Sequence, residues 1–214
     1  MSSAELLGDT VYADLLERVV DGRLPPGTVL SVAALAVELG VSRSPVRESV
    51  QRLITEGIAV TSAHSAARVA TVGPSELEEV LRVREVLDGL AAAEATNRAD
   101  AEGVRRLVEA LAEHERTLGD PPDPAVDAAL DVRFHALLRQ LSGNATLADT
   151  LRRLEVRAHL FGAGLWTDRR HRELAVAEHR RIVEAVEAGD VEAARRNAAA
   201  HVAALAVRLR RATR

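Results

Sequence analysis

The chain has 214 residues, of which 28 are basic and 32 acidic, and its formal net charge is −4. It contains no cysteine, which excludes disulfides and thiolate metal sites. No stretch approaches the roughly 18 apolar residues of a membrane span, and the N-terminus lacks the basic start and apolar run of a signal peptide. We therefore expect a cytoplasmic protein without membrane contact, long enough for two small domains or one larger domain.

Apolar side chains at helical spacing predict a first helix over residues 9–21. A turn follows at Pro25-Pro26-Gly27. Residues 30–58 then predict two short helices separated by a tight turn at Gly40-Val41. Two helices joined in this way are typical of a helix-turn-helix, whose second helix reads DNA.

The second helix of this pair has two distinct faces. Val46 and Leu53 follow the spacing of a buried face. Arg43, Arg47 and Gln51 lie four residues apart and share another face. An arginine near the start of such a helix can enter the major groove and donate two parallel hydrogen bonds to guanine. The pattern therefore favours DNA binding over the alternative, an ordinary amphipathic helix with a solvated charged face.

Capping residues and local charge support the same interpretation. Ser42 or Ser44 can cap the second helix, and Pro45 is tolerated in its first turn. Residues 41–70 hold four arginines against two glutamates, a local net charge of +2 in a chain that is negative overall. We therefore expect a focused positive potential, and an affinity for DNA that falls steeply with salt.

Residues 58–72 alternate loosely between apolar and polar side chains and predict a small β-hairpin, or wing. His64 and Arg68 are candidates to reach the minor groove or a phosphate from this wing. The break at Gly73-Pro74-Ser75 predicts a domain boundary, with Ser75 and Glu78 forming a capping box at the start of the next helix. We expect a winged helix-turn-helix domain over residues 1–73 and an all-helical domain over residues 74–214.

The second domain is predicted to be helical throughout, so the fold class is mainly α. The pattern contains six helical segments, and recognised helix stops at 119–122, 142–144, 162–164 and 189–190 mark four of the breaks between them. These segments cover residues 75–98, 101–118, 124–142, 145–162, 169–188 and 191–212. Six helices in a domain of this length predict an antiparallel bundle.

Histidines in this domain suggest a metal site. Asp131 and His135 lie four residues apart, so they project from one face of one helix. His179 and His201 each lie eleven residues from Asp190, which marks the turn between the last two helices. In an antiparallel hairpin both would lie at the same height, about 16 Å from the turn. Three histidines and one carboxylate suit a divalent ion such as Zn²⁺ or Ni²⁺.

An ordinary role as a surface or core residue is the alternative for any single histidine. His114, His159 and His171 are assigned to that role. The Asp-x-x-x-His pair is by itself a weak signal, and the symmetry about Asp190 is what strengthens it.

Several N-terminal motifs occur in a characteristic order: Gly22-Arg23-Leu24-Pro25-Pro26-Gly27, Leu35-Ala36, Gly40-Val41-Ser42-Arg43-Ser44-Pro45-Val46-Arg47-Glu48, Arg52-Leu53 and Glu56-Gly57. Together they resemble the winged-helix domain of GntR-family transcription regulators. The resemblance implies that Ser42, Arg43, Ser44 and Arg47 contact DNA, with Arg52 a weaker candidate. It also implies a homodimer on a short palindromic operator.

Two positions depart from the family pattern. Val32 and Ala33 stand where many relatives carry a polar or basic residue, which puts a DNA contact there in doubt. The wing lacks the glycine that relatives usually have. His64 and Arg68 can still reach the groove or a phosphate without it.

The second domain carries a further set of motifs: Asp131-Val132-Arg133-Phe134-His135, Gly143-Asn144, Glu178-His179 with Ile182, Gly189-Asp190 with Ala194, and His201. These resemble the FCD effector domain of the FadR-type branch of GntR regulators, and six bundle helices resemble its VanR-like subgroup. The resemblance implies that Asp131, His135, His179 and His201 hold a divalent metal, with Zn favoured and Ni or Mn possible. It implies that the metal in turn binds a small carboxylate effector.

Arg84 belongs to an Arg-x-x-Leu-Asp run that resembles the family's first bundle helix. The resemblance implies that Arg84 holds a second carboxylate of the effector through a bidentate pair. Arg82 and Arg157 are alternatives for this role. An intrahelical salt bridge from Arg84 to Asp88 is the competing interpretation.

The leading hypothesis is a dimeric, ligand-responsive transcription regulator that acts as a repressor and is not an enzyme. A metal-dependent hydrolase is one alternative, because an open three-histidine site also suits hydrolysis. No recognisable motif places a general base for it. A regulator whose metal is purely structural is the other alternative, and chelation would then unfold the bundle.

Overall fold

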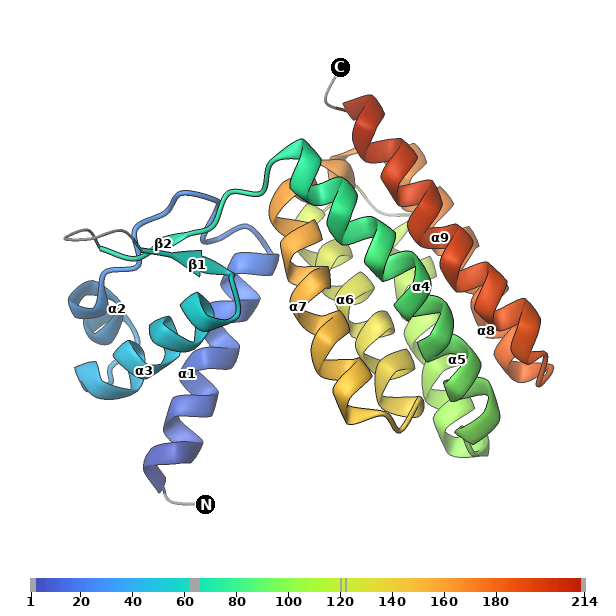
Figure 1. The fold of residues 1–214 in the computed structure, drawn as a ribbon, viewed down its shortest axis with the longest axis horizontal. Coiled ribbons are helices and arrows are strands. Elements are labelled where there is room, and N and C mark those ends of the chain that lie inside the picture. Colours follow the sequence, from blue (N-terminus) through green and yellow to red (C-terminus); the bar gives the residue numbers. More distant parts are fainter. Residues whose placement is uncertain (1–2, 62–65, 120, 122, 213–214) are drawn as a thin grey trace. The chain divides into compact units, whose positions relative to one another are not determined.

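The computed structural model describes residues 3–61, 66–119, 121 and 123–212, and the chain divides into two compact units, residues 1–72 and 73–214. In its described part, the N-terminal unit contains three helices and a two-stranded hairpin (Figure 1). Its elements are α1 (Ser3–Val20), α2 (Val32–Glu38), α3 (Arg43–Thr55), β1 (Ala59–Val60) and β2 (Arg68–Val69). The predicted winged helix-turn-helix is confirmed.

Helix α1 packs against α3 and closes a small aliphatic core. Leu15 from α1 is fully buried there with Val46 and Leu53 from α3. Burying a large aliphatic side chain contributes about 1.5–3 kcal/mol, which fixes the orientation of α3 in the unit. The face of α3 that carries Arg43 and Arg47 is consequently left exposed.

The turn between α2 and α3 depends on glycine. Gly40 has φ +65°, a left-handed conformation that residues with a Cβ rarely adopt. The hairpin that follows α3 is antiparallel, with Ala59 opposite Val69 and Val60 opposite Arg68. The predicted wing is therefore present as a short hairpin, although its tip at 62–65 lies outside the described residues.

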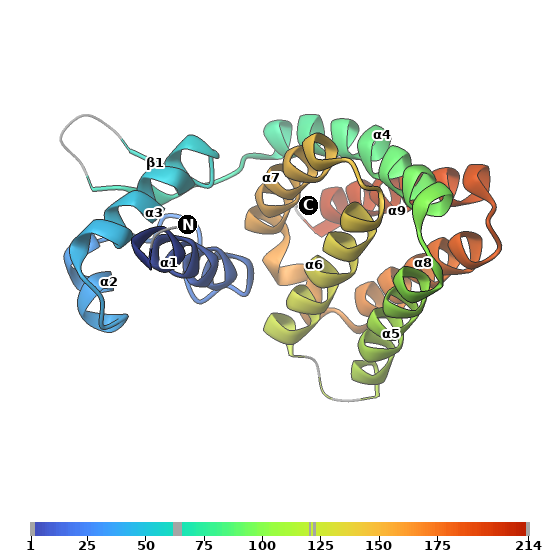
Figure 2. The ribbon, with the colours of Figure 1, turned by 90° about the horizontal axis from the view of Figure 1, so that it is seen from below.

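The C-terminal unit is an antiparallel bundle of the six predicted α-helices (Figures 1 and 2). They are α4 (Pro74–Arg98), α5 (Ala101–Thr117), α6 (Pro124–Leu141), α7 (Ala145–Gly162), α8 (Arg169–Glu187) and α9 (Val191–Ala212), with a short 3-10 helix, η1 (Ala163–Thr167), between α7 and α8. Helix α4 packs most extensively against α9. Among the described residues no helix is both long and apolar enough to cross a membrane.

The predicted capping box at the start of this unit is wrong. Pro74 is the first residue of α4 and Gly73 occupies the N-cap position, so Ser75 already lies inside the helix. Proline is favoured at the first helical position because its missing N–H would have no helical partner there. The proline therefore determines where the helix begins, and the serine does not cap it.

Aliphatic packing holds the bundle together and isolates a polar interior. Phe134, Leu107 and Ile182 are fully buried in its main apolar cluster. Trp166, the only tryptophan of the chain, is 5% exposed and packs in a smaller cluster with Ala128 and Ala175. Several histidines and charged residues lie between these apolar groups, and they form the candidate site described below.

Candidate DNA-reading helix and candidate metal centre

The exposed face of α3 carries two arginines available for a partner. Arg43 and Arg47 are both exposed, and within the described part of the chain neither pairs with an acidic side chain. Ser42 occupies the N-cap position of α3 but makes no side-chain capping bond. The Ser44 hydroxyl donates to Glu48 at 3.1 Å. This end of α3 therefore presents two unpaired guanidinium groups beside two hydroxyls.

The other predicted DNA contacts are placed differently. Arg52 pairs with Asp9 at 3.1 Å and with Glu56 at 3.3 Å, and its guanidinium lies over the Tyr12 ring. Arg68 donates a hydrogen bond to the Gly27 carbonyl at 3.0 Å. Both side chains therefore also stabilise the N-terminal unit. The predicted contact at His64 lies outside the described residues.

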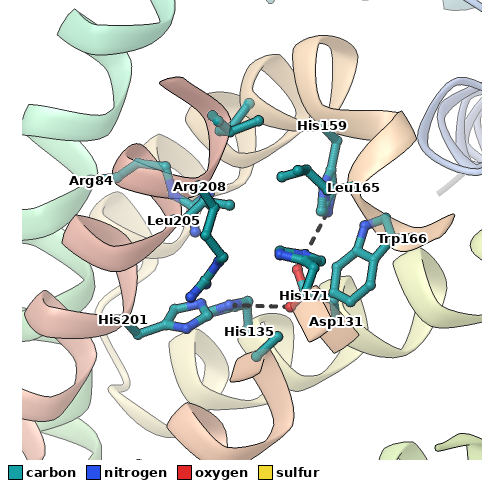
Figure 3. A pocket seen from close by; sticks show the side chains of 13 residues that line it. Arg84, Asp131, His135, His159, Leu165, Trp166, His171, His201, Leu205 and Arg208 are labelled. Carbon is teal, nitrogen blue, oxygen red and sulfur yellow. Dashed lines mark ion pairs between the residues drawn. The ribbon is translucent and has the colours of Figure 1, made fainter. Parts of the chain in front are cut away.

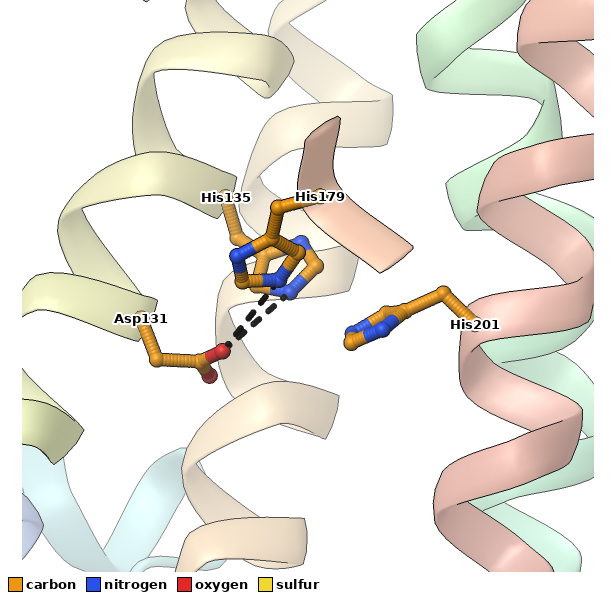
Figure 4. A group of neighbouring side chains, drawn as sticks. All are labelled: Asp131, His135, His179 and His201. Carbon is orange, nitrogen blue, oxygen red and sulfur yellow. Dashed lines mark ion pairs between the residues drawn. The ribbon is translucent and has the colours of Figure 1, made fainter. Parts of the chain in front are cut away.

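Three helices of the bundle bring Asp131, His135, His179 and His201 together (Figure 4). We call this group the Asp–His cluster. One ligand atom from each residue lies within 4.8 Å of all the others, and all four side chains are buried. Asp131 Oδ1 is 3.4 Å from His179 Nε2 and 3.8 Å from His135 Nε2. The imidazole rings of His179 and His201 lie 4.7 Å apart, as the symmetry about the final turn predicted.

The donor atoms of this cluster suit a divalent cation. Both ring nitrogens of His135 and both of His179 are buried, and within the described residues none has a hydrogen-bond partner. Buried polar atoms in native proteins are rarely left without a partner. A metal ion bound by the imidazole lone pairs would satisfy these nitrogens. Imidazole and carboxylate donors in this combination fit Zn²⁺ and its first-row neighbours.

Protonation in the cluster depends on burial. Burial lowers the pKa of His135 and of His179 well below the usual range, and neighbouring imidazoles lower both further. Both rings are therefore neutral, which is the form that binds metals. Burial raises the pKa of Asp131 to about 8; Glu155 acts in the same direction and Arg84 opposes it. A cation next to Asp131 would favour its carboxylate form.

Glu178 orients the His201 ring through a contact at Nδ1. The His201 ring lies with Nδ1 2.8 Å from the Glu178 carboxylate, which Arg208 also contacts at 2.6 and 2.9 Å. Burial would raise the pKa of Glu178, but hydrogen bonds from His201 and Arg208 outweigh it and lower that pKa to about 2. The charged carboxylate accepts a hydrogen bond from Nδ1–H of His201, which leaves Nε2 free for a metal. Sequence reasoning assigned no role to Glu178, although it precedes His179 directly.

A small cavity of about 30 Å³ adjoins the Asp–His cluster (Figure 3). Its lining includes Arg84, whose Nε donates to Asp88 at 3.0 Å, with both side chains buried. The salt bridge considered as an alternative is therefore present, and the same guanidinium also borders the cavity. The predicted alternatives Arg82 and Arg157 do not line this cavity.

Two histidines for which the sequence predicted only a surface or core role, His159 and His171, also line the cavity. The Nε2 atom of His159 lies 3.5 Å from Asp131 Oδ2, so His159 borders the Asp–His cluster directly. His171 packs edge-on against Trp166 with ring centroids 4.7 Å apart. Figure 3 shows these rings across the cavity from Arg84 and Arg208. No spacing rule marks them in the sequence, because they come from different helices and do not pair about a turn.

Comparisons with known proteins match both units. Residues 7–69 match the family described as bacterial regulatory proteins, gntR family, and residues 79–204 match the FCD domain. The "Probable D-xylose utilization operon transcriptional repressor" of Paenarthrobacter nicotinovorans is 32% identical over 89% of this chain and 83% of its own length. The "Uncharacterized HTH-type transcriptional regulator YdhC" of Bacillus subtilis is 28% identical over 89% of this chain and 85% of its own.

Among solved structures, E. coli McbR/YncC is similar over 100% of both chains, with a TM-score of 0.88 and 24% identity. At this identity the likeness concerns the fold.

Proposed function

Because the chain belongs to the GntR family of bacterial regulatory proteins and carries an FCD domain, we propose that it is a metal-dependent repressor that responds to a small organic acid. The chain is a DNA-binding transcription regulator and not an enzyme. The observation that carries the sensing part is the buried Asp–His cluster with its unpartnered ring nitrogens. The Paenarthrobacter relative is named a probable repressor, which supports repression over activation of transcription.

In this proposal the Asp–His cluster holds one divalent metal, with Zn favoured and Ni or Mn as alternatives. When bound, the metal supplies a Lewis-acidic point for the carboxylate of the effector. Glu178 fixes the ring of His201, and Arg84 adds a positive charge at the cavity wall. We assign DNA binding to a domain over residues 1–73. We assign effector binding to a domain over residues 74–214, a helical bundle of the VanR-like type.

On the DNA side, we assign base contacts to Arg43 and Arg47, supported by Ser42 and Ser44. Arg52, Arg68 and His64 remain candidates for backbone contacts. A homodimer would place two such helices on the halves of a palindromic operator. The effector would act by binding two arrangements of the dimer with different affinity, which shifts the population away from the one that fits the operator.

This function predicts a metal-dependent effector response. Operator DNA can be selected from a random library, and its affinity for zinc-loaded protein measured by fluorescence anisotropy with a panel of 2-hydroxy acids. We expect the active acid to weaken operator binding by about 5- to 150-fold, the usual range of allosteric coupling. Protein treated with a chelator should bind the operator but ignore the acid. An operator affinity that no acid changes would contradict the sensing role and leave DNA binding intact.

The DNA-reading assignment predicts a large effect at Arg47. Arg47→Ala should weaken operator binding by about 5- to 150-fold, because one bidentate arginine–guanine contact is worth about 1–3 kcal/mol. Arg23→Ala is the matched control, since Arg23 is also exposed in this unit but pairs with Asp21 and Glu17. Equal losses in both variants would indicate a general charge effect and would contradict base reading by Arg47.

A further inference from the structure

Two hollows in the bundle share three lining residues. The first, which we call the inner cavity, is the space of about 30 Å³ next to the Asp–His cluster. The second, the outer hollow, has a volume of about 350 Å³. Leu165, His171 and Arg208 line both spaces, and we call the boundary that they share the passage.

The volumes restrict how an acid can occupy this site. The inner cavity has room for about two water molecules, whereas pockets that enclose a whole small ligand measure roughly 300–1,000 Å³. Only the group that binds the metal therefore fits inside. The remainder of the ligand has to pass His171 and Arg208 and extend into the outer hollow.

His171 is placed to contact a ligand in the passage. Its side chain is 3% exposed, and its Nδ1 atom is buried without a hydrogen-bond partner in the described part of the chain. Trp166 fixes the ring edge-on from one side. A buried imidazole nitrogen without a partner is costly. A polar group of a ligand in the passage would remove that cost.

The outer hollow is positively charged. Among the described residues, its lining contains Arg170, Arg208 and Arg211 and one acidic residue, Asp168. Arg208 is already bonded to Glu178. Arg170 and Arg211 are exposed, and among the described residues neither has an acidic partner. A second anionic group on the ligand would therefore find two uncommitted guanidinium groups here.

We propose that the effector is an acid with two anionic ends, one bound at the metal centre and the other in the outer hollow by Arg170 and Arg211, with His171 contacting the part between them. This inference rests on the proposed function, because it requires the metal-bound end. It adds a second binding site and restricts the effector to elongated di-anionic acids. The distal group can be a carboxylate or a phosphate, which share the chemistry that arginine recognises.

The test is isothermal titration calorimetry on the zinc-loaded full chain with matched pairs of acids. Lactate and malate differ by a distal carboxylate, and glycerate and 3-phosphoglycerate differ by a distal phosphate. We expect the second anion to tighten binding at least about tenfold in one or both pairs, as a bidentate charged contact can provide. The pair with the larger gain identifies the distal group.

Variants locate the second site. Arg170→Gln/Arg211→Gln should abolish the gain from the distal anion and leave the one-ended acids unchanged. His171→Leu should weaken the two-ended acid without changing the zinc content. Arg169→Gln is the control, because Arg169 is a neighbouring exposed arginine that pairs with Glu173 and lies outside the hollow.

The outcomes separate the inference from the function on which it rests. One-ended acids that bind as tightly as two-ended acids would overturn the second site and leave the proposed sensing intact. A distal gain that survives the double variant would also overturn it. If no acid binds the zinc-loaded protein, the sensing part of the proposed function fails and this inference fails with it.

Discussion

The His179→Ala/His201→Ala protein is expected to contain no zinc after purification and dialysis, whereas the unaltered chain should hold about one zinc ion per chain. The two substitutions remove the imidazoles that α8 and α9 contribute to the Asp–His cluster. Only two ligands, both from α6, would remain, and two ligands are fewer than zinc sites in proteins use. Mass spectrometry of the metal content measures the loss directly.

A matched control separates loss of ligands from damage to the fold. His114 is as buried as His179, with ring centroids 6.0 Å from it, but it does not belong to the Asp–His cluster. His114→Gln should therefore keep its zinc. Circular dichroism of all three proteins should show unchanged helix content. Zinc retained at full stoichiometry by the folded double variant would refute the four-ligand assignment.

The same proteins distinguish a sensory metal from a structural one. Trp166 is the only tryptophan and lies in the bundle, so its fluorescence reports unfolding of this unit alone. At a zinc concentration 1,000 times the Kd, binding should stabilise the bundle by about 4 kcal/mol. A sensory site predicts that the chelated bundle stays folded with a lower melting temperature. A bundle that unfolds on chelation at 25 °C would instead support the structural alternative.

Local patterns were sufficient to predict most of the fold. Four of the five junctions between the bundle helices carry a recognisable stop, and the Gly189-Asp190 turn fixes which residues of α8 and α9 face each other. Asp131 and His135 share a face through their spacing of four. The spacing alone does not show that this face of α6 points at α8 and α9. That step was a hypothesis from spacing and symmetry that the family resemblance strengthened, since packing between distant helices is not encoded in local periodicity.

The surroundings of the metal centre could not be predicted in the same way. Glu178 lies one residue from the position paired with His201, yet its role depends on how α9 presents Arg208 to it. His171 enters the passage because η1 and the start of α8 turn its ring against Trp166. These placements result from side-chain packing in three dimensions. They determine which ligand fits, so specificity is the property that the sequence reveals least.

Arg172→Met is expected to destabilise the bundle by about 3–5 kcal/mol, the usual cost of removing one partner of a buried ion pair. Arg172 is 1% exposed and is the largest fully buried side chain among the described residues. Its Nε lies 2.6 Å from Asp127 Oδ2, and its Nη2 donates to the Thr117 carbonyl. The substitution would leave the Asp127 carboxylate buried without its cation. Urea denaturation followed by Trp166 fluorescence measures the change.

The control for this loss comes from the same helix. Arg169 pairs with Glu173 on the surface, where both side chains are more than half exposed. Exposed pairs contribute about 0–1 kcal/mol, so Arg169→Met should change the stability only slightly. A similar loss in both variants would show that Arg172 does not act through its buried pair.

A second substitution tests the physical cause. If the cost of Arg172→Met comes from the unpaired carboxylate, then Arg172→Met/Asp127→Leu should be more stable than the single variant, because no charge is left buried alone. If the cost comes from lost packing, the double variant should be at least as unstable. A typical domain is stable by only about 5–15 kcal/mol, so the single loss is a large fraction of the total. Helix α8 also carries His179. The ion pair between Arg172, in the first turn of α8, and Asp127 of α6 therefore helps to hold the helix on which the metal centre depends.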